Sequence, residues 1–377
     1  MTQASTPCLP GSSHGNRDHS LGAPPSSRHG STPNPASTPN VAQPAADHFR
    51  HPDPFPLVHG GELPELCLSY ELSGPFGAPL VVAQGGISAS CHVVATPRDP
   101  SLGWWRALVG EGRAVDPTHV RVLSFDYLGG NGESSCPWDH REPPAADPPV
   151  AIDPRDQARA LVRLLDHLGE PRIDLFLGAS YGGMVALALA AEHPKRLGRA
   201  VVVGAADRAH PRSTAWRTVQ RRIVQLATRN GASQEGLALS RALAMTTYRS
   251  ADELEQRFGG RAERQDDGRL RFPVEGYLDA RGDDFARHFD PRAFLTLSQS
   301  IDLHHVDPEE VATPVTLVGA TSDQLVPIGQ LRRLASSLGE WGRLVEIESI
   351  YGHDAFLKEE RAIGAVVRSE LRAGGLV

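Results

Sequence analysis

The stretch Ile-Asp-Leu-Phe-Leu-Gly-Ala-Ser-Tyr-Gly-Gly-Met at residues 173–184 decides the fold. Its first half is a short apolar run that predicts a buried strand, and a strongly apolar helical pattern follows at 181–193. Between the two lies the pattern G-x-S-x-G, with Ser180 at its centre. Such a pattern can arise by chance, but between a strand and a helix it is typical of a sharp turn that exposes a serine hydroxyl. We therefore interpret Ser180 as a nucleophile.

Outward from this turn, apolar runs alternate with helical patterns, which predicts a mostly parallel sheet covered by helices on both faces. Strands are predicted at residues 66–72, 79–84, 120–125, 173–177, 199–203, 314–319 and 344–350, and helices at 153–168, 181–193 and 328–338. Between residues 206 and 300 the sequence is helical in pattern, rich in arginine and without clear buried strands. We predict one α/β core, formed by residues 51–205 and 301–377, with a helical lid inserted at 206–300.

Residues 1–50 are rich in Pro, Ser, Gly, Asn and His, and we predict a disordered N-terminal tail. Among the 377 residues, 38 are Lys or Arg and 45 are Asp or Glu, and the formal charge of -7 gives no indication of nucleic-acid binding. No apolar run is long enough for a membrane span, and we expect no secretory signal. The four cysteines form no C-x-x-C pair, which favours a reducing compartment, so we expect a cytoplasmic protein.

A serine nucleophile needs a base, and the base needs an acid that orients it. In α/β hydrolases the order along the chain is Ser, then Asp or Glu, then His. Asp323 follows one late predicted strand and His353 follows the next, so we assign Asp323 as the orienting acid and His353 as the base. Three other histidines are rivals for the base: His304, His305 and His92. The first two lie with the insertion, and the third follows an early strand, where an oxyanion loop belongs.

The oxyanion hole is predicted to consist of two backbone N–H groups. One belongs to Tyr181, the residue after the nucleophile. The other belongs to Gly86 or Ile87 in the loop after the strand at 79–84, and the sequence does not choose between them. No H-E-x-x-H pattern or paired Cys and His spacing occurs, and no G-x-G-x-x-G follows the first strand, so we predict neither a metal nor a nucleotide cofactor.

Further motifs resemble the MetX-type homoserine O-acyltransferases, a family of α/β hydrolases. They are GWW at 103–105, LGGNG at 128–132, SYGGM at 180–184, TYRS at 247–250, FPVEGYL at 272–278 and GHDAF at 352–356. The resemblance covers roughly residues 55–365. The chain departs from the family pattern at GGISASCHV, residues 85–93, and at Asp126, where the family commonly has Asn.

The resemblance implies a homoserine O-acetyltransferase of methionine biosynthesis, which converts acetyl-CoA and L-homoserine to O-acetyl-L-homoserine and CoA. The implied reaction is ping-pong, passes through an acyl-Ser180 intermediate and needs no cofactor beyond its acyl-CoA co-substrate. Arg241 matches the substrate-binding arginine of the family and would pair with the acceptor's carboxylate, although an ordinary salt bridge in the lid would also explain it. Asp354 would hold the acceptor's α-ammonium. Lids of this family often form a dimer interface, so we expect a homodimer.

Leu325 bears on the choice of acyl group. In succinyl-specific relatives an Arg commonly lies two residues after the triad Asp, and in this chain that position is Leu325. An apolar side chain offers a succinyl carboxylate no partner, which favours acetyl-CoA over succinyl-CoA as the donor. Three alternatives stay open: succinyl transfer that uses a different arginine, L-serine as the acceptor, and hydrolysis by an esterase with the same triad.

Overall fold

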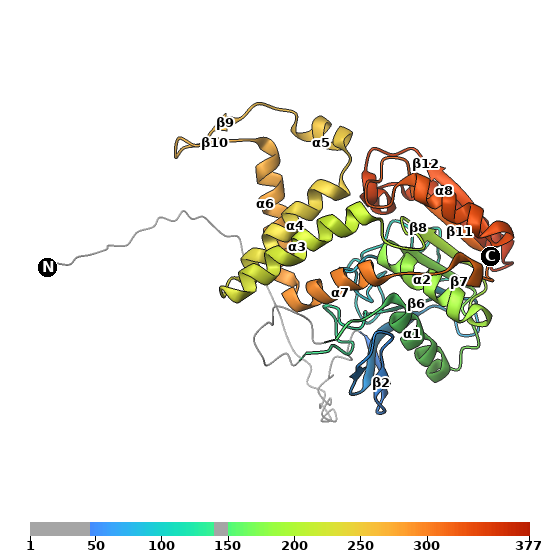
Figure 1. Cartoon of the computed structure of the whole chain (residues 1–377). Helices are drawn as coiled ribbons and strands as arrows, with labels where there is room; N and C mark the ends of the chain where they lie inside the picture. Colours follow the sequence, from blue (N-terminus) through green and yellow to red (C-terminus); the bar gives the residue numbers. More distant parts are fainter. Residues whose placement is uncertain (1–45, 139–149) are drawn as a thin grey trace, which may run out of the picture. The chain divides into compact units, whose positions relative to one another are not determined.

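The computed structural model describes residues 46–138 and 150–377 (Figure 1). Its main feature is an eight-stranded sheet with the strand order β1-β4-β6-β5-β7-β8-β11-β12. The bounds are β1 (Asp47–His51), β4 (Leu66–Ser73), β5 (Leu80–Gln84), β6 (Arg121–Phe125), β7 (Leu175–Ala179), β8 (Ala200–Val203), β11 (Val315–Ala320) and β12 (Gly342–Ile347). Strand β4 runs antiparallel to both of its neighbours. The neighbours in the remaining series β6-β5-β7-β8-β11-β12 are all parallel to one another. The predicted mostly parallel sheet is confirmed.

Both faces of the sheet are buried because successive strand residues enter two different apolar clusters. In β5, Leu80 and Val82 join a cluster with α1 (Pro154–Leu168), α2 (Tyr181–Glu192) and α8 (Ile328–Ser337). The intervening Val81 and Ala83 join a cluster with α10 (Glu360–Ala373). Helix α1 begins at a capping box in which Asp153 and Asp156 each accept a hydrogen bond from the other's backbone N–H. The shorter elements are β2 (Phe55–Pro56), β3 (Glu62–Leu63), α9 (Ala355–Lys358) and 3-10 turns at Pro194–Arg196, Pro308–Glu310, Gly339–Trp341 and Gly352–Asp354.

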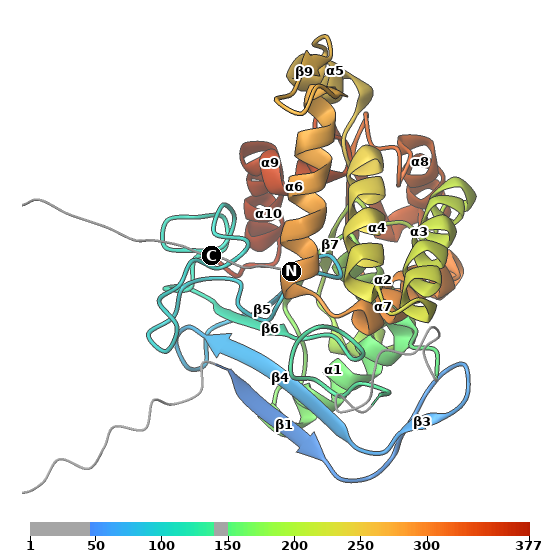
Figure 2. The ribbon, with the colours of Figure 1, turned by 90° about the vertical axis from the view of Figure 1, so that its left-hand side faces the viewer.

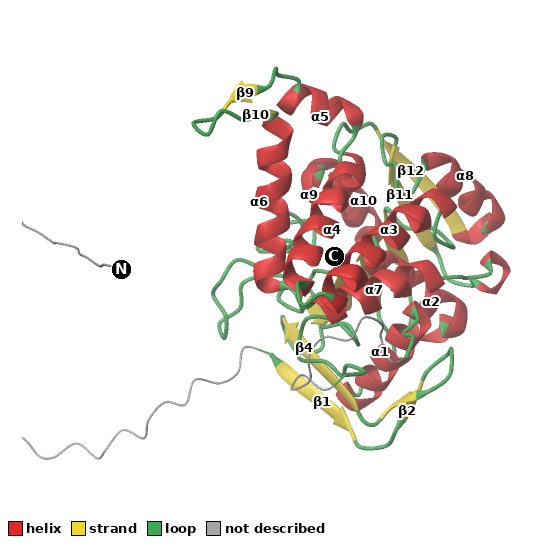
Figure 3. Cartoon of the chain, turned by 60° about the vertical axis from the view of Figure 1, so that its left-hand side comes forward, coloured by secondary structure: helices red, strands yellow, loops and turns green. Residues whose placement is uncertain are grey.

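Five helices and a small hairpin lie between β8 and β11, and we refer to them as the lid. They are α3 (Pro211–Arg229), α4 (Ser233–Tyr248), α5 (Ala251–Phe258), β9 (Glu263–Arg264), β10 (Leu270–Arg271), α6 (Pro273–His288) and α7 (Pro291–Leu303). Helix α4 packs between α3 and α6 (Figure 2). The close approach of α4 and α6 depends on Gly282, since a Cβ at that position would lie 2.5 Å from the carbonyl oxygen of Ala238. Figure 3 shows that the lid is helical apart from this hairpin. None of the helices in the described residues is long and apolar enough to cross a membrane.

The N-terminal boundary differs from the prediction. Residues 1–45 of the predicted tail lie outside the described residues, but Asp47–His51 form strand β1, which pairs with β4 (Figure 3). The folded part therefore begins before the predicted boundary at residue 50. The stretch Asp-His-Phe-Arg-His has only one large apolar residue, Phe49, because β1 is an edge strand that buries a single side chain. A single apolar residue does not produce the alternation of apolar and polar residues by which a strand is predicted.

We predict that Phe49→Ala lowers the free energy of unfolding by about 3–5 kcal/mol, the usual cost of removing a buried phenylalanine side chain. Phe49 is 5% exposed and lies in the larger apolar cluster. Phe76→Ala is the matched control, since Phe76 is fully exposed and its removal should change stability by less than about 0.5 kcal/mol. Urea unfolding followed by circular dichroism measures both. Equal stability of the two variants would show that β1 does not belong to the cooperative fold.

Candidate active site

Ser180 lies in a sharp turn between β7 and α2. It is the one residue other than glycine with a positive φ in the described part of the chain, at φ 52° and ψ -117°. The backbone N–H of Ser180 donates to the carbonyl of Val203 at 2.8 Å, which ties the turn to β8. Glycines make room for the turn, because a Cβ at Gly178 would lie 2.4 Å from the carbonyl oxygen of Gly182. The turn places Ser180 at the N-terminus of helix α2, where the helix dipole contributes positive partial charge.

The predicted partners of Ser180 meet it in space. The distance from Ser180 Oγ to His353 Nε2 is 2.8 Å, and from His353 Nδ1 to Asp323 Oδ2 it is 2.7 Å. Because a carboxylate only accepts hydrogen bonds, His353 donates from Nδ1, and its Nε2 accepts from the Ser180 hydroxyl. The structure therefore brings all three predicted residues into one hydrogen-bonded relay at the carboxyl ends of β7, β11 and β12.

The carboxylate of Asp323 is fixed on both of its oxygens. Oδ2 faces His353, and Oδ1 accepts from the backbone N–H groups of Leu325 and Val326 at 2.8 and 3.0 Å. These contacts orient the acid before any ligand binds. Asp323 and His353 are 6% and 7% exposed, so the pair is shielded from water. Such an acid holds the imidazole in the tautomer that a general base requires.

Two opposing effects set the pKa of His353. Burial lowers it, while the charge and the hydrogen bond of Asp323 and the charge of Asp354 raise it, and the net result is a pKa above the ordinary value of 6.5. His353 is thus protonated more readily than a free histidine. Only its neutral form can accept a proton from Ser180.

The predicted oxyanion donors lie next to Ser180 in the chain or in the loop beside it. Within the described residues, the backbone N–H groups of Gly86 and Ile87 have no hydrogen-bond acceptor, and Tyr181 begins helix α2, where an N–H has no partner within the helix. A Cβ at Gly86 would lie 3.9 Å from Ser180 Cβ, and Ile87 lines the same pocket as Ser180. These contacts bring the loop of Gly86 and Ile87 next to Ser180, and the choice between the two as the second donor stays open.

Asp126, which departs from the family pattern, supports the oxyanion loop. Its carboxylate accepts from the backbone N–H of Cys91 at 2.7 Å and from that of Glu133 at 3.3 Å. The neighbouring Tyr127 donates its hydroxyl to the carbonyl of Gly85 at 2.7 Å. Both residues thus connect the end of β6 to the loop that follows β5, and the acidic side chain replaces none of the predicted donors.

Neither of the predicted acceptor-binding residues, Arg241 and Asp354, is among the residues that line the pocket at Ser180, but each lies against a residue that does. The guanidinium of Arg241 packs on the rings of Tyr248 and Phe285, with centroid distances of 5.2 and 4.8 Å, and it has no ion-pair partner among the described residues. Tyr248 lines the pocket and its ring lies 5.8 Å from that of His353. Asp354 is buried and forms an ion pair with Arg249 at 3.1 Å, a partner that the sequence did not indicate.

A pocket opens at Ser180 and His353, and Leu325 is among the residues that line it. Arg208, His210 and Arg217 also line this pocket, although sequence reasoning assigned them no role. They lie at the start of the lid in a stretch with many arginines, where no motif distinguishes a pocket residue from a surface residue. No Asp or Glu is among the residues that line the pocket.

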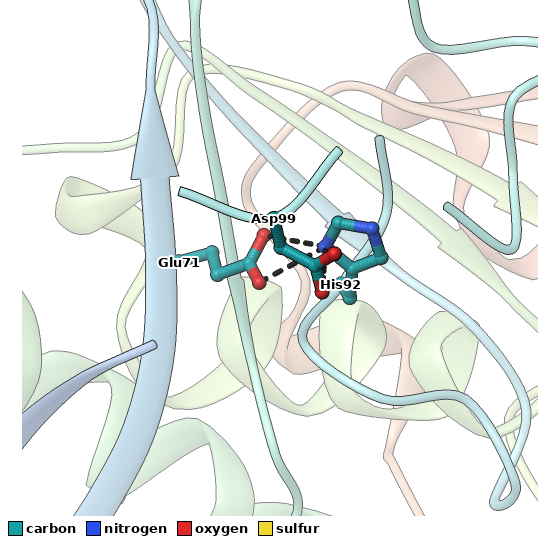
Figure 4. A group of neighbouring side chains, drawn as sticks. All are labelled: Glu71, His92 and Asp99. Atoms are coloured by element: carbon teal, nitrogen blue, oxygen red, sulfur yellow. Dashed lines mark hydrogen bonds and ion pairs between the residues drawn. The ribbon is translucent and has the colours of Figure 1, made fainter. Parts of the chain in front are cut away.

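The rival histidines take no part in the relay. His304 is buried and its Nε2 donates to the carbonyl of Ala206, and His305 forms an isolated bridge with Arg208. His92 Nδ1 lies 3.0 Å from Glu71 and 3.7 Å from Asp99 (Figure 4).

The groups around His92 could in principle surround a cation. However, the Nε2 of His92 donates to the carbonyl of Ser101 at 3.0 Å and its Nδ1 donates to Glu71, so both ring nitrogens carry a proton and neither can bind a cation. We interpret this cluster as an ion pair that connects the loop after β5 to β4.

Comparison with known proteins agrees with this geometry. Residues 79–360 match the alpha/beta hydrolase fold family. A homoserine O-succinyltransferase of Xanthomonas campestris pv. campestris is 42% identical over 351 residues, which are 91% of this chain and 91% of that protein. The chain belongs to the homoserine O-acyltransferase family of α/β hydrolases. The resemblance that the sequence motifs carry is thereby confirmed.

Other members of the homoserine O-acyltransferase family and their neighbours differ in donor and acceptor. A homoserine O-acetyltransferase of Thermus thermophilus is 33% identical over 86% of this chain and 91% of its own length. A serine O-succinyltransferase of Stenotrophomonas maltophilia is 32% identical over 85% and 96%. The crystal structure of homoserine O-acetyltransferase from Staphylococcus aureus matches with a TM-score of 0.72 and 27% identity, over 86% of this chain and 94% of that one.

The pKa of His353 predicts how Ser180 responds to pH. Its reaction with a fluorophosphonate reagent should slow as pH falls through an apparent pKa above 6.5, because protonated Nε2 cannot accept the serine proton. Asp354→Asn should move this fall in the reaction rate to lower pH, since the charge of Asp354 raises the pKa of His353. Glu360→Gln, which removes an exposed charge, is the control and should leave the pH at which the rate falls unchanged. Inactivation rates between pH 5 and 9 measure the effect. If the rate of Asp354→Asn falls at the same pH as that of the wild type, the charge of Asp354 does not raise the pKa of His353.

Proposed function

We propose that the protein is an acyl-CoA-dependent O-acyltransferase that acylates the side-chain hydroxyl of homoserine through an acyl-Ser180 intermediate. The observation that carries the proposal is the relay from Ser180 through His353 to Asp323. Ser180 and His353 line a pocket that is also lined by residues of the lid. The full-length similarity to homoserine O-acyltransferases supports this choice among the reactions that such a relay can catalyse. No cofactor takes part in the proposed reaction.

In the first half-reaction, His353 Nε2 takes the proton from Ser180 as Oγ attacks the thioester carbonyl. The carbonyl oxygen becomes an oxyanion, which the N–H of Tyr181 and that of Gly86 or Ile87 would stabilise. The C–S bond then breaks, His353 returns the proton to the thiolate, and CoA leaves an acyl-Ser180 ester. Each oxyanion donor of this kind typically lowers the barrier by about 2.7–4 kcal/mol.

In the second half-reaction, the same His353 accepts the proton of the homoserine hydroxyl as its oxygen attacks the acyl-serine. The ester bond to Ser180 Oγ breaks, and the proton returns to that oxygen. The ring of Tyr248 beside His353 and the apolar wall of the pocket limit the access of water. Exclusion of water is what separates a transferase from a hydrolase with the same relay.

The charged ends of homoserine need an anion and a cation at fixed positions. We propose that Arg241 pairs with the carboxylate, which is supported by its position against Tyr248 and by the lack of an ion-pair partner for it in the described residues. We propose that Asp354 binds the ammonium. Its Oδ2 pairs with Arg249, while its Oδ1 has no hydrogen bond within the described part of the chain.

Donor and acceptor can each be one of two compounds. Leu325 lines the pocket and favours acetyl-CoA, whereas the 42% identical relative is a succinyltransferase and favours succinyl-CoA. L-Serine is the alternative acceptor, since a serine O-succinyltransferase is 32% identical to this chain. Hydrolysis of a carboxylic ester is the alternative reaction. A homodimer in the cytoplasm stays our expectation for the assembly and its location.

We predict that an acyl group from acyl-CoA accumulates on Ser180 when no acceptor is present, because deacylation then depends on water. Rapid quenching, proteolysis and mass spectrometry should find the acyl mass on the peptide that contains Ser180. Ser180→Ala should abolish both the acyl mass and the burst of CoA thiol. Acylation of a different residue, or a thiol burst that persists in Ser180→Ala, would contradict the proposed nucleophile.

A further inference from the structure

Arg217 brings a positive charge to the pocket that holds Ser180 and His353. It lies on α3 and lines the pocket together with Leu325 and Trp216. Its side chain is 12% exposed, whereas that of Arg208, the other arginine of the pocket, is 56% exposed. Arg217 therefore belongs to the inner part of the pocket, and Arg208 lies toward solvent.

The hydrogen bonds of Arg217 leave part of its guanidinium available. Nε and Nη2 both donate to Oδ1 of Asp302, at 2.8 and 2.6 Å. Nη1 has no hydrogen-bond acceptor among the described residues. A guanidinium has five N–H donors, so Arg217 keeps three of them for a ligand: both on Nη1 and one on Nη2.

The charges around Arg217 do not cancel. Asp302 also accepts from Nη1 of Arg221 at 2.6 Å and from the hydroxyl of Thr214 at 2.8 Å. One carboxylate thus serves two guanidinium groups, and the three side chains are 9–17% exposed. An uncompensated charge in such a place is costly unless an anion or water accompanies it. No acidic residue among those that line the pocket supplies that anion.

We infer that Arg217 recognises a carboxylate at the far end of the acyl chain, so that the preferred donor is a dicarboxylic acyl-CoA such as succinyl-CoA. This inference rests on the proposed function. The anion in question belongs to the acyl group because Arg217 lies in the inner pocket with Leu325, next to the acid that orients His353. Leu325 then packs against the methylene groups of the chain, and its apolar character does not exclude succinyl.

The chemical step is the acylation described above with a charged acyl group. The bond from Ser180 Oγ to the acyl carbon forms, the C–S bond to CoA breaks, and the serine proton passes through His353 to the thiolate. Arg217 takes part in neither bond change. It determines specificity by binding the distal carboxylate in both the thioester and the acyl-serine.

The test compares two donors in the first half-reaction, without any acceptor amino acid. The burst of CoA thiol is measured with succinyl-CoA and acetyl-CoA in the wild type, Arg217→Gln and Arg217→Lys. Arg222→Gln is the matched control, because Arg222 is an exposed arginine on the same helix. Leaving out homoserine ensures that an effect on acceptor binding cannot contribute.

We expect the wild type to react faster with succinyl-CoA. Arg217→Gln should lower the succinyl-to-acetyl ratio of kcat/KM by about ten- to a hundred-fold, the usual effect of one charge-assisted hydrogen bond. Arg217→Lys should retain more of the ratio than Arg217→Gln, and Arg222→Gln should leave it unchanged. A purely structural role of Arg217 in the lid would slow both donors equally and leave the ratio constant.

Two results would overturn the inference while the proposed function stands. They are a Ser180-dependent burst whose donor ratio is the same in Arg217→Gln and in the wild type, and a wild type that prefers acetyl-CoA. If neither donor gives a burst that Ser180→Ala abolishes, the proposed function itself fails, and the inference fails with it.

Discussion

The backbone at Ser180 has a conformation that a serine does not readily adopt, and the rest of the site depends on it. A φ of 52° with a ψ of -117° is sparsely populated for any residue with a Cβ, and conformations of this kind cost about 1–3 kcal/mol. The surrounding structure maintains the turn through the bond from Ser180 to Val203 and through glycines at positions where no Cβ fits. In this conformation the hydroxyl of Ser180 lies within hydrogen-bond distance of His353 Nε2.

Parallel strands bring distant parts of the chain to this turn. Asp323 follows β11 and His353 follows β12, so the acid and the base arrive at the same edge of the sheet as the serine. In the proposed function, the core supplies the catalytic relay, and arginines of the lid bind the charged groups of the substrates. Arg241 on α4 and Arg217 on α3 approach the relay from the lid. Variation in the lid can therefore change the donor or the acceptor without a change in the relay.

Much of this arrangement could be predicted from the sequence, for identifiable physical reasons. Continuous apolar runs reveal strands that are buried on both faces, and the positions of Asp323 and His353 after two such runs indicate their place at one edge. Strand β1 was missed because an edge strand buries only Phe49. The role of Arg217 was missed because its partner Asp302 lies 85 residues further along the chain, and only the fold brings the two together. The pairing of Asp354 with Arg249 escaped prediction for the same reason.

The most direct test of the proposed transferase is the fate of the acyl group when homoserine and water compete for acyl-Ser180. CoA, O-acylhomoserine and free carboxylic acid are quantified in one reaction while the homoserine concentration is raised. We predict that the release of CoA accelerates with homoserine and that, at saturation, close to one O-acylhomoserine forms for each CoA. A rate of CoA release that does not respond to homoserine, with free acid as the main product, would identify a hydrolase and contradict the proposed function.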